Sequence, residues 1–166
     1  MAMGFFRRKR ADDSPRADVY EGLRNQVLNL STDQLGDAFA EVPILALLME
    51  TGYPEAVATL AGVVDGTSSL YFSNGGGVIG AGTHAAVADA NKRWLETGAT
   101  YLPQLSATSH APLPGEGMTQ FVAVTPQELR AAAAREDDLG EGRHRLTPLF
   151  YAAQDVITQI RLSQED

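Results

Sequence analysis

Two glycine-containing turns separate three short strand-like segments, and this pattern constrains the fold more than any other feature of the sequence. Residues 56–64 are rich in Val, Ala and Thr and end at Asp65-Gly66, a dipeptide favoured in two-residue hairpin turns. Residues 67–73 follow as a second strand-like segment, and Asn74-Gly75-Gly76 supplies the next turn before residues 77–81. Three consecutive strands with turn residues at both joints predict an antiparallel meander.

Segments with helical features precede the meander. Residues 18–30 repeat apolar side chains at the spacing of an amphipathic helix. Ser31 is followed three positions later by Gln34, a capping-box pattern that predicts the start of a second, shorter helix. Residues 42–49 are apolar almost throughout and include Pro43, which suits the first turn of a helix. We therefore expect a third, buried helix there.

A central helix and two further strands are expected after the meander. Residues 83–102 show helical periodicity, and residues 106–117 are interrupted by prolines as in a loop. Residues 118–125 have the composition of a strand. Residues 126–135 fit either a helix that begins with a capping box or a strand, and we favour the strand because it gives the preceding strand a partner. Thr147-Pro148 then predicts the start of a closing helix.

The expected architecture is an α+β fold with an antiparallel sheet of about five strands, made of a three-strand meander, a helix and a two-strand hairpin, packed with helices. This element order, together with acidic charge and size, resembles the type III secretion chaperones over roughly residues 17–162. The resemblance rests on no diagnostic motif and implies a small homodimeric chaperone-like protein. The alternative resemblance is to the roadblock and profilin-like adaptors, which place two strands before the central helix and three after it.

The charge divides the chain into two parts. The 166 residues carry a formal net charge of −8, yet residues 1–16 hold five basic and two acidic side chains, a net +3, which leaves −11 for residues 17–166. We expect a basic disordered tail followed by a single acidic domain. An acidic domain repels phosphate backbones, so nucleic-acid binding is not expected. The tail has the composition of segments that contact anionic membranes or acidic partners, through Phe5, Phe6, Arg7, Arg8, Lys9 and Arg10.

The residues that usually carry chemistry form no local motif. The chain has no cysteine, which excludes disulfides, cysteine-zinc sites and thiol catalysis. Its three histidines, His84, His110 and His144, are far apart in sequence, so none forms a metal-ligand pair by spacing. We therefore expect no catalytic residue, no metal and no cofactor, and the sequence favours a non-catalytic protein. With no secretory signal or long apolar span, a cytoplasmic location is the simplest expectation.

One glycine-rich segment supports a different function. Its glycines satisfy the G-x-G-x-x-G spacing of dinucleotide sites, although no second strand with an acidic end follows the helix. The alternative function is therefore a small-molecule or nucleotide-binding protein, perhaps an enzyme, that uses the backbone of this segment. Its candidate ligand-binding residues are Asn74, Gly75, Gly76, Gly77, Gly80, Gly82 and His84.

The main functional expectation is a non-catalytic protein-binding, adaptor or chaperone-like module that acts as a homodimer. It rests on the lack of a local catalytic or metal-binding motif and on the large apolar side chains of residues 42–49 and of the helix face that carries Trp94. The candidate interface residues are Ile44, Leu47, Leu48 and Trp94.

Overall fold

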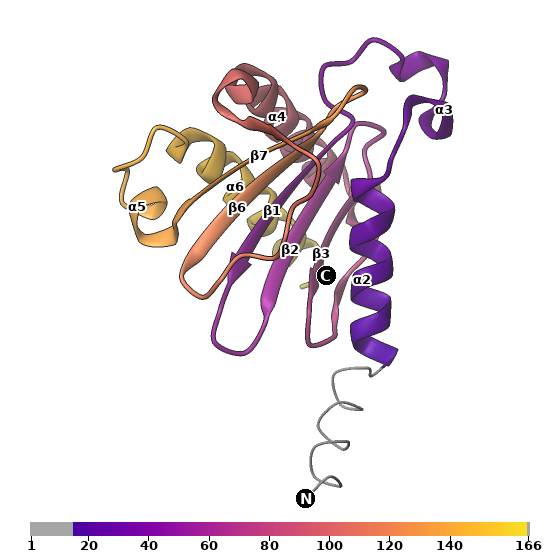
Figure 1. Cartoon of the computed structure of the whole chain (residues 1–166). Helices are drawn as coiled ribbons and strands as arrows, with labels where there is room; N and C mark the ends of the chain where they lie inside the picture. The colour runs from indigo at the N-terminus through magenta and orange to yellow at the C-terminus, as the bar shows by residue number, and fades with distance from the viewer. Residues whose placement is uncertain (1–14, 166) are drawn as a thin grey trace, which may run out of the picture.

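The computed structural model describes residues 15–165, and the side chains from residue 18 onward. Residues 1–14, with the aromatic and basic positions expected to contact membranes or acidic partners, lie outside the described part. The fold is α+β and is built on an antiparallel seven-stranded sheet, with strands in the order β4-β3-β2-β1-β6-β7-β5 (Figure 1). The strands are β1 (Ala46–Gly52), β2 (Val57–Val63), β3 (Ser68–Phe72), β4 (Gly77–Val78), β5 (Ser106–Thr108), β6 (Met118–Val124) and β7 (Leu129–Arg135).

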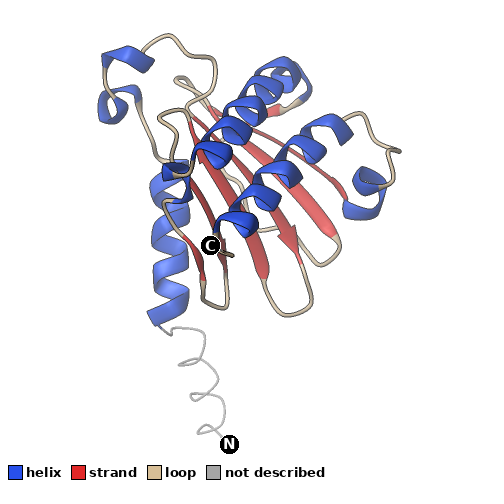
Figure 2. Ribbon diagram, turned by 180° about the vertical axis from the view of Figure 1, so that it is seen from behind, coloured by secondary structure: helices blue, strands red, loops and turns tan. Residues whose placement is uncertain are grey.

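Helices cover the two faces of the sheet unequally. Two long helices, α4 and α6, lie side by side on one face, and α2 lies alone on the other (Figures 1 and 2). The α-helices are α2 (Pro15–Leu28), α3 (Thr32–Leu35), α4 (Ala85–Tyr101), α5 (Glu136–Gly140) and α6 (Thr147–Ser163). Short 3-10 turns occupy Asp37–Phe39, Ala81–Thr83 and Leu102–Gln104.

The expected buried helix at residues 42–49 is wrong, because residues 42–45 lie outside any helix or strand and residues 46–49 begin β1, a central strand of the sheet. Every residue of β1 is buried. A strand covered on both faces is apolar without interruption, and periodicity cannot separate such a strand from a buried helix. Pro43 lies just before the strand and not in a helix.

The expectation of about five strands is also wrong, since the sheet gains β1 and the three-residue β5. β5 begins the segment that was expected to be a loop, and it pairs with β7. Two predictions are confirmed, the antiparallel meander before the central helix and the strand within residues 126–135 after it. β2, β3 and β4 form the antiparallel meander, with β4 reduced to two residues, and β7 pairs with β6 as a hairpin.

The hydrophobic core has two layers, one on each face of the sheet. Alternate residues of β1 divide between them, so that Leu47 and Met49 contact the α4–α6 layer while Leu48 lies on the α2 side. β7 contributes to both layers, with Ala132 on the α4–α6 side and Leu129 on the α2 side.

The described part of the chain contains no helix that is both long and apolar enough to cross a membrane.

Candidate functional site

The predicted glycine segment splits into two parts with different surroundings. Asn74 lies in the turn between β3 and β4, and Gly75, Gly76 and Gly77 follow with positive φ angles of 107°, 87° and 139°. These backbone conformations favour glycine because it has no Cβ. A Cβ on Gly77 would also collide with the backbone of Leu70, so close strand packing alone accounts for glycine at this position.

The second part of the segment leads from the sheet into α4. Gly80 has a left-handed φ of 74°, and a Cβ on Gly82 would collide with the carbonyl oxygen of Gly66. His84 is exposed and immediately precedes the first residue of α4. The structure therefore does not bring all of the predicted ligand residues together, and of these only Gly75, Gly76 and Gly77 line a common groove.

This groove lies between α2 and the β3–β4 hairpin and has a volume of about 370 Å³. Its surface is mainly apolar, and neither Lys, Arg nor His is among the described residues that line it. Val19 and Ile79, at 59% and 60% exposure, leave large apolar side chains open to solvent at the groove. The remaining lining residues are Tyr20, Leu23, Tyr71, Phe72 and Gly75–Gly77.

The four predicted interface residues are buried inside the chain. Ile44, Leu47, Leu48 and Trp94 are each at most 2% exposed. Ile44, Leu47 and Trp94 belong to the α4–α6 layer, and Leu48 packs on the opposite face of the sheet. None of them lies on the surface of this fold, so the structure gives them a role in the core.

A row of polar side chains crosses the sheet next to the groove. Directly paired positions place Tyr71 of β3 beside Thr59 of β2, Thr59 beside Glu50 of β1, and Glu50 beside Gln120 of β6. Directly opposite residues share a face of the sheet, and Tyr20 and Arg24 of α2 contact this row, so it lies on the α2 side. The row therefore places a carboxylate beneath the helix, in the middle of the sheet.

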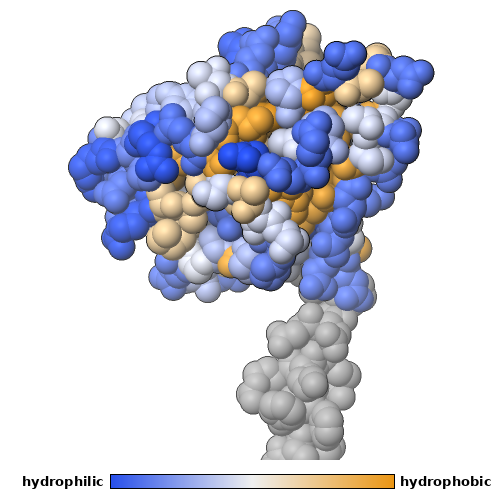
Figure 3. All heavy atoms as spheres, turned by 45° about the horizontal axis from the view of Figure 1, so that its top comes forward, coloured by the Kyte–Doolittle hydropathy of each residue, from blue (hydrophilic) through white to orange (hydrophobic). Residues whose placement is uncertain are grey.

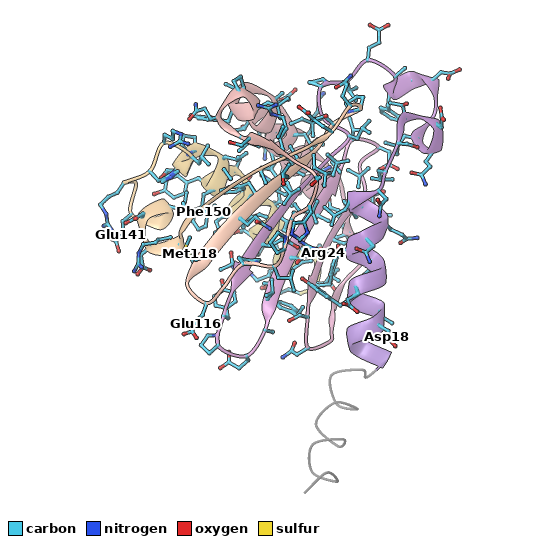
Figure 4. The ribbon with its side chains drawn as sticks, in the orientation of Figure 1. Asp18, Arg24, Glu116, Met118, Glu141 and Phe150 are labelled. Carbon is cyan, nitrogen blue, oxygen red and sulfur yellow. The ribbon has the colours of Figure 1, made fainter. Side chains whose placement is uncertain are left out.

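Arg24 and Glu50 form the strongest polar contact of this row. The Arg24 guanidinium donates from Nε to Glu50 Oε2 at 2.6 Å and from Nη2 to Oε1 at 2.8 Å, a two-point geometry that fixes both groups. Nη2 also donates to the backbone oxygen of Ala111 at 2.6 Å. Figure 4 shows Arg24 reaching from α2 across the sheet. Burial alone would lower the pKa of Arg24, but the hydrogen bonds and charge of Glu50 outweigh it and raise that pKa.

Neighbouring side chains complete the shell of Glu50, which is 0% exposed. Thr59 Oγ1 donates to Oε2 at 3.0 Å, and Gln120 Nε2 donates to Oε1 at 3.3 Å. Because the Thr59 proton points to the carboxylate, the Tyr20 hydroxyl donates to Thr59 at 2.8 Å. Each Glu50 oxygen thus accepts hydrogen bonds from two groups, and the carboxylate joins α2 to the sheet.

Tyr20 and Tyr71 belong both to the polar row and to the lining of the groove. The rings of Tyr20 and Tyr71 meet edge to face, with centroids 5.6 Å apart. Burial raises the pKa of Tyr20 to about 12, although the hydrogen bond to Thr59 acts to lower that pKa. Burial and the negative charge of Glu50 raise the pKa of Tyr71. The Tyr71 hydroxyl is buried without a hydrogen-bond partner among the described residues.

Sequence reasoning missed this row, although two signals pointed to it. Glu50 directly follows a long apolar run, and a carboxylate inside a buried strand needs a partner. Arg24 is the one Lys or Arg between residues 17 and 91, which makes it the nearest candidate in sequence. Both signals depend on reading residues 42–49 as a strand.

Within the described chain, no group of three or more His, Asp or Glu side chains is placed to hold a metal ion. Comparison with known proteins finds no match to a family model, to a curated protein or to a solved structure.

Proposed function

We propose that this chain is a non-catalytic protein-binding module of adaptor or chaperone-like type, that it acts as a homodimer, and that the groove between α2 and the β3–β4 hairpin takes up an apolar segment of a protein partner. The observation that carries the proposal is the groove itself, whose apolar lining includes two well-exposed large side chains, Val19 and Ile79. Exposed apolar surface that is gathered in one place is typical of interaction sites.

The chemistry around the groove supports binding over catalysis. The carboxylate of the polar row, Glu50, is buried and accepts hydrogen bonds on both oxygens, and the two tyrosines have raised pKa values and so stay protonated at neutral pH. Figure 3 shows that apolar and polar side chains both reach the surface on this side of the molecule, and that the outer face of α2 is polar. An apolar partner segment would gain about 25 cal/mol for each Å² of apolar surface removed from water.

Photo-crosslinking in the source cell tests the groove. A photoreactive residue replacing Ile79 is expected to give a discrete protein adduct that disappears when Val19→Asp is added. The matched control is the same photoreactive residue in place of Leu162, which is also well exposed but lies near the end of α6. Equal adducts at both positions, or an adduct that survives Val19→Asp, would contradict groove binding.

A thermal-shift experiment separates this function from the nucleotide alternative. Nucleotides and inorganic phosphate are expected to leave the melting temperature unchanged, because the described groove lining holds no basic side chain. A ligand at 100 times its Kd would add about 2.7 kcal/mol to stability. A clear upward shift with a nucleotide would favour the alternative.

A further inference from the structure

The segment that begins with α2 is attached to the rest of the fold by few buried side chains. From residue 18 to residue 43, Tyr20 is the one described side chain that is buried. α3 and the 3-10 turn Asp37–Phe39 contain no buried residue. Elements with few buried contacts open at low free-energy cost. No described residue of α2 belongs to the α4–α6 layer, so α2 can separate from the sheet without disturbing that layer, at the cost of the contacts of Tyr20 and Arg24.

The surface beneath α2 nevertheless requires an occupant with a defined chemistry. Glu50 is fully buried, and its charge is balanced by Arg24 of α2. Removing the cation would leave a buried charge with no counter-ion, which is strongly unfavourable. Tyr20 adds a hydrogen bond to Thr59, one helical turn before Arg24. The surface thus selects a helix with a tyrosine and an arginine four residues apart.

We propose that α2 is exchanged between two copies of this chain, so that Arg24 of each copy pairs with Glu50 of the partner subunit. The inference rests on the homodimer of the proposed function and names the contact that forms it. The helix that fits this surface in the structure is the chain's own α2. Any other copy of the chain carries an α2 with the same side chains. Exchange of an identical element between protomers keeps each contact while closing a two-fold dimer.

The connection between α2 and the sheet is long enough for this exchange. Residues 29–43 lie between α2 and the buried Ile44 and Leu45 that precede β1, and fully extended they span up to roughly 50 Å. Exchange has a further consequence for the groove. Val19, Tyr20 and Leu23 would come from one copy, and Tyr71 with the β3–β4 hairpin from the other. The partner-binding groove is then complete only in the dimer.

A photoreactive residue in place of Leu23 tests the exchange in the full-length protein. Leu23 packs against the cluster of Tyr20, Ala61 and Tyr71. In a mixture of ¹⁴N- and ¹⁵N-labelled copies, we expect covalent dimers in which α2 of one isotope is joined to β2 or β3 of the other. The same probe at Leu162 is the control and should give no such product. Crosslinks confined to single chains would overturn the exchange.

Charge reversal provides an independent test. Arg24→Glu and Glu50→Arg each place like charges together when present alone. In a mixed exchanged dimer, every α2–sheet contact again pairs opposite charges. We expect the two variants to be unstable or insoluble when expressed separately and to recover as a one-to-one dimer when co-expressed. No recovery on co-expression would overturn the proposal, even where one variant alone fails to fold.

The outcomes separate this inference from the proposed function. A wild-type chain that stays monomeric at all concentrations in light scattering would overturn both the exchange and the homodimer. A stable dimer whose Leu23 probe reacts only within its own chain would overturn the exchange and leave the homodimer standing.

Discussion

At the scale of single residues, the polar row beneath α2 holds two tyrosines in contact but in different states. The Tyr20 hydroxyl has a partner in Thr59, whereas the Tyr71 hydroxyl has none among the described residues. A buried polar group without a partner costs free energy, and a paired one contributes a modest gain.

The two matched Tyr→Phe substitutions should therefore differ in sign or size. Tyr20→Phe is expected to lower the free energy of unfolding by about 1 kcal/mol, because Thr59 loses a hydrogen bond. Tyr71→Phe is expected to be neutral or slightly stabilising, because it removes an unpaired hydroxyl. Urea denaturation of both variants measures the difference, and an equal loss in the two would contradict this assignment.

The buried ion pair should matter far more than an exposed one. Glu50→Gln leaves the Arg24 charge without its counter-ion, so we expect a loss of about 3–5 kcal/mol in the free energy of unfolding. Asp155→Asn breaks the exposed pair with Arg93 and is expected to cost at most about 1 kcal/mol. Chemical denaturation of the two variants provides the comparison, and similar losses would argue against the ion pair as the main contact of α2.

The two tyrosines also make the stability of the fold decrease at high pH. The pKa of Tyr20 rises from 10 to about 12 on folding, with burial as the main cause, and that of Tyr71 is also raised. The folded state therefore binds these protons more tightly than the unfolded state. Their contribution is fully present below pH 10 and is lost as the pH rises through the folded-state pKa. Denaturation at increasing pH should show stability falling above pH 10 and less steeply in Tyr20→Phe.

At the scale of elements, α2 and α6 are both helices on the sheet but differ in how they are held. α6 has a continuous buried stripe that includes Leu149, Ala153, Val156 and Ile160. In the described part of α2, Tyr20 alone is buried. Packing of an apolar face, more than intrinsic propensity, holds helices in proteins.

Hydrogen exchange should therefore distinguish the two helices. Backbone amides of α2 are expected to exchange much faster than those of α6, and Arg24→Ala should speed exchange in α2 more than in α6. Exchange monitored by mass spectrometry resolves both segments. Equal protection of α2 and α6 would show that α2 opens only with the whole domain.

The elements differ in how well the sequence predicts them. The meander and the last helix follow from turn residues and periodicity, which are local signals. β1 does not, because burial on both faces removes the alternation that marks a strand. The candidate site depends on that strand, since Arg24 and Glu50 are 26 positions apart and meet only through sheet topology. Local periodicity does not show such a contact, which needs the strand assignment of β1 first.

At the scale of the whole molecule, the proposed homodimer makes stability depend on concentration. Because association favours the folded state, the Tm of the wild-type chain should rise with protein concentration. In Arg24→Ala this dependence is expected to weaken, since the exchanged contact is lost. Scanning calorimetry across a concentration series measures it, and a constant Tm for the wild type would contradict the dimer.

The two borders of the sheet have a consequence for assembly. β4 contributes two residues at one border and β5 three at the other. Such short strands offer few free backbone groups to a neighbouring chain, which guards against open-ended strand addition and fibre growth. Growth by adding strands at β4 or β5 is therefore disfavoured.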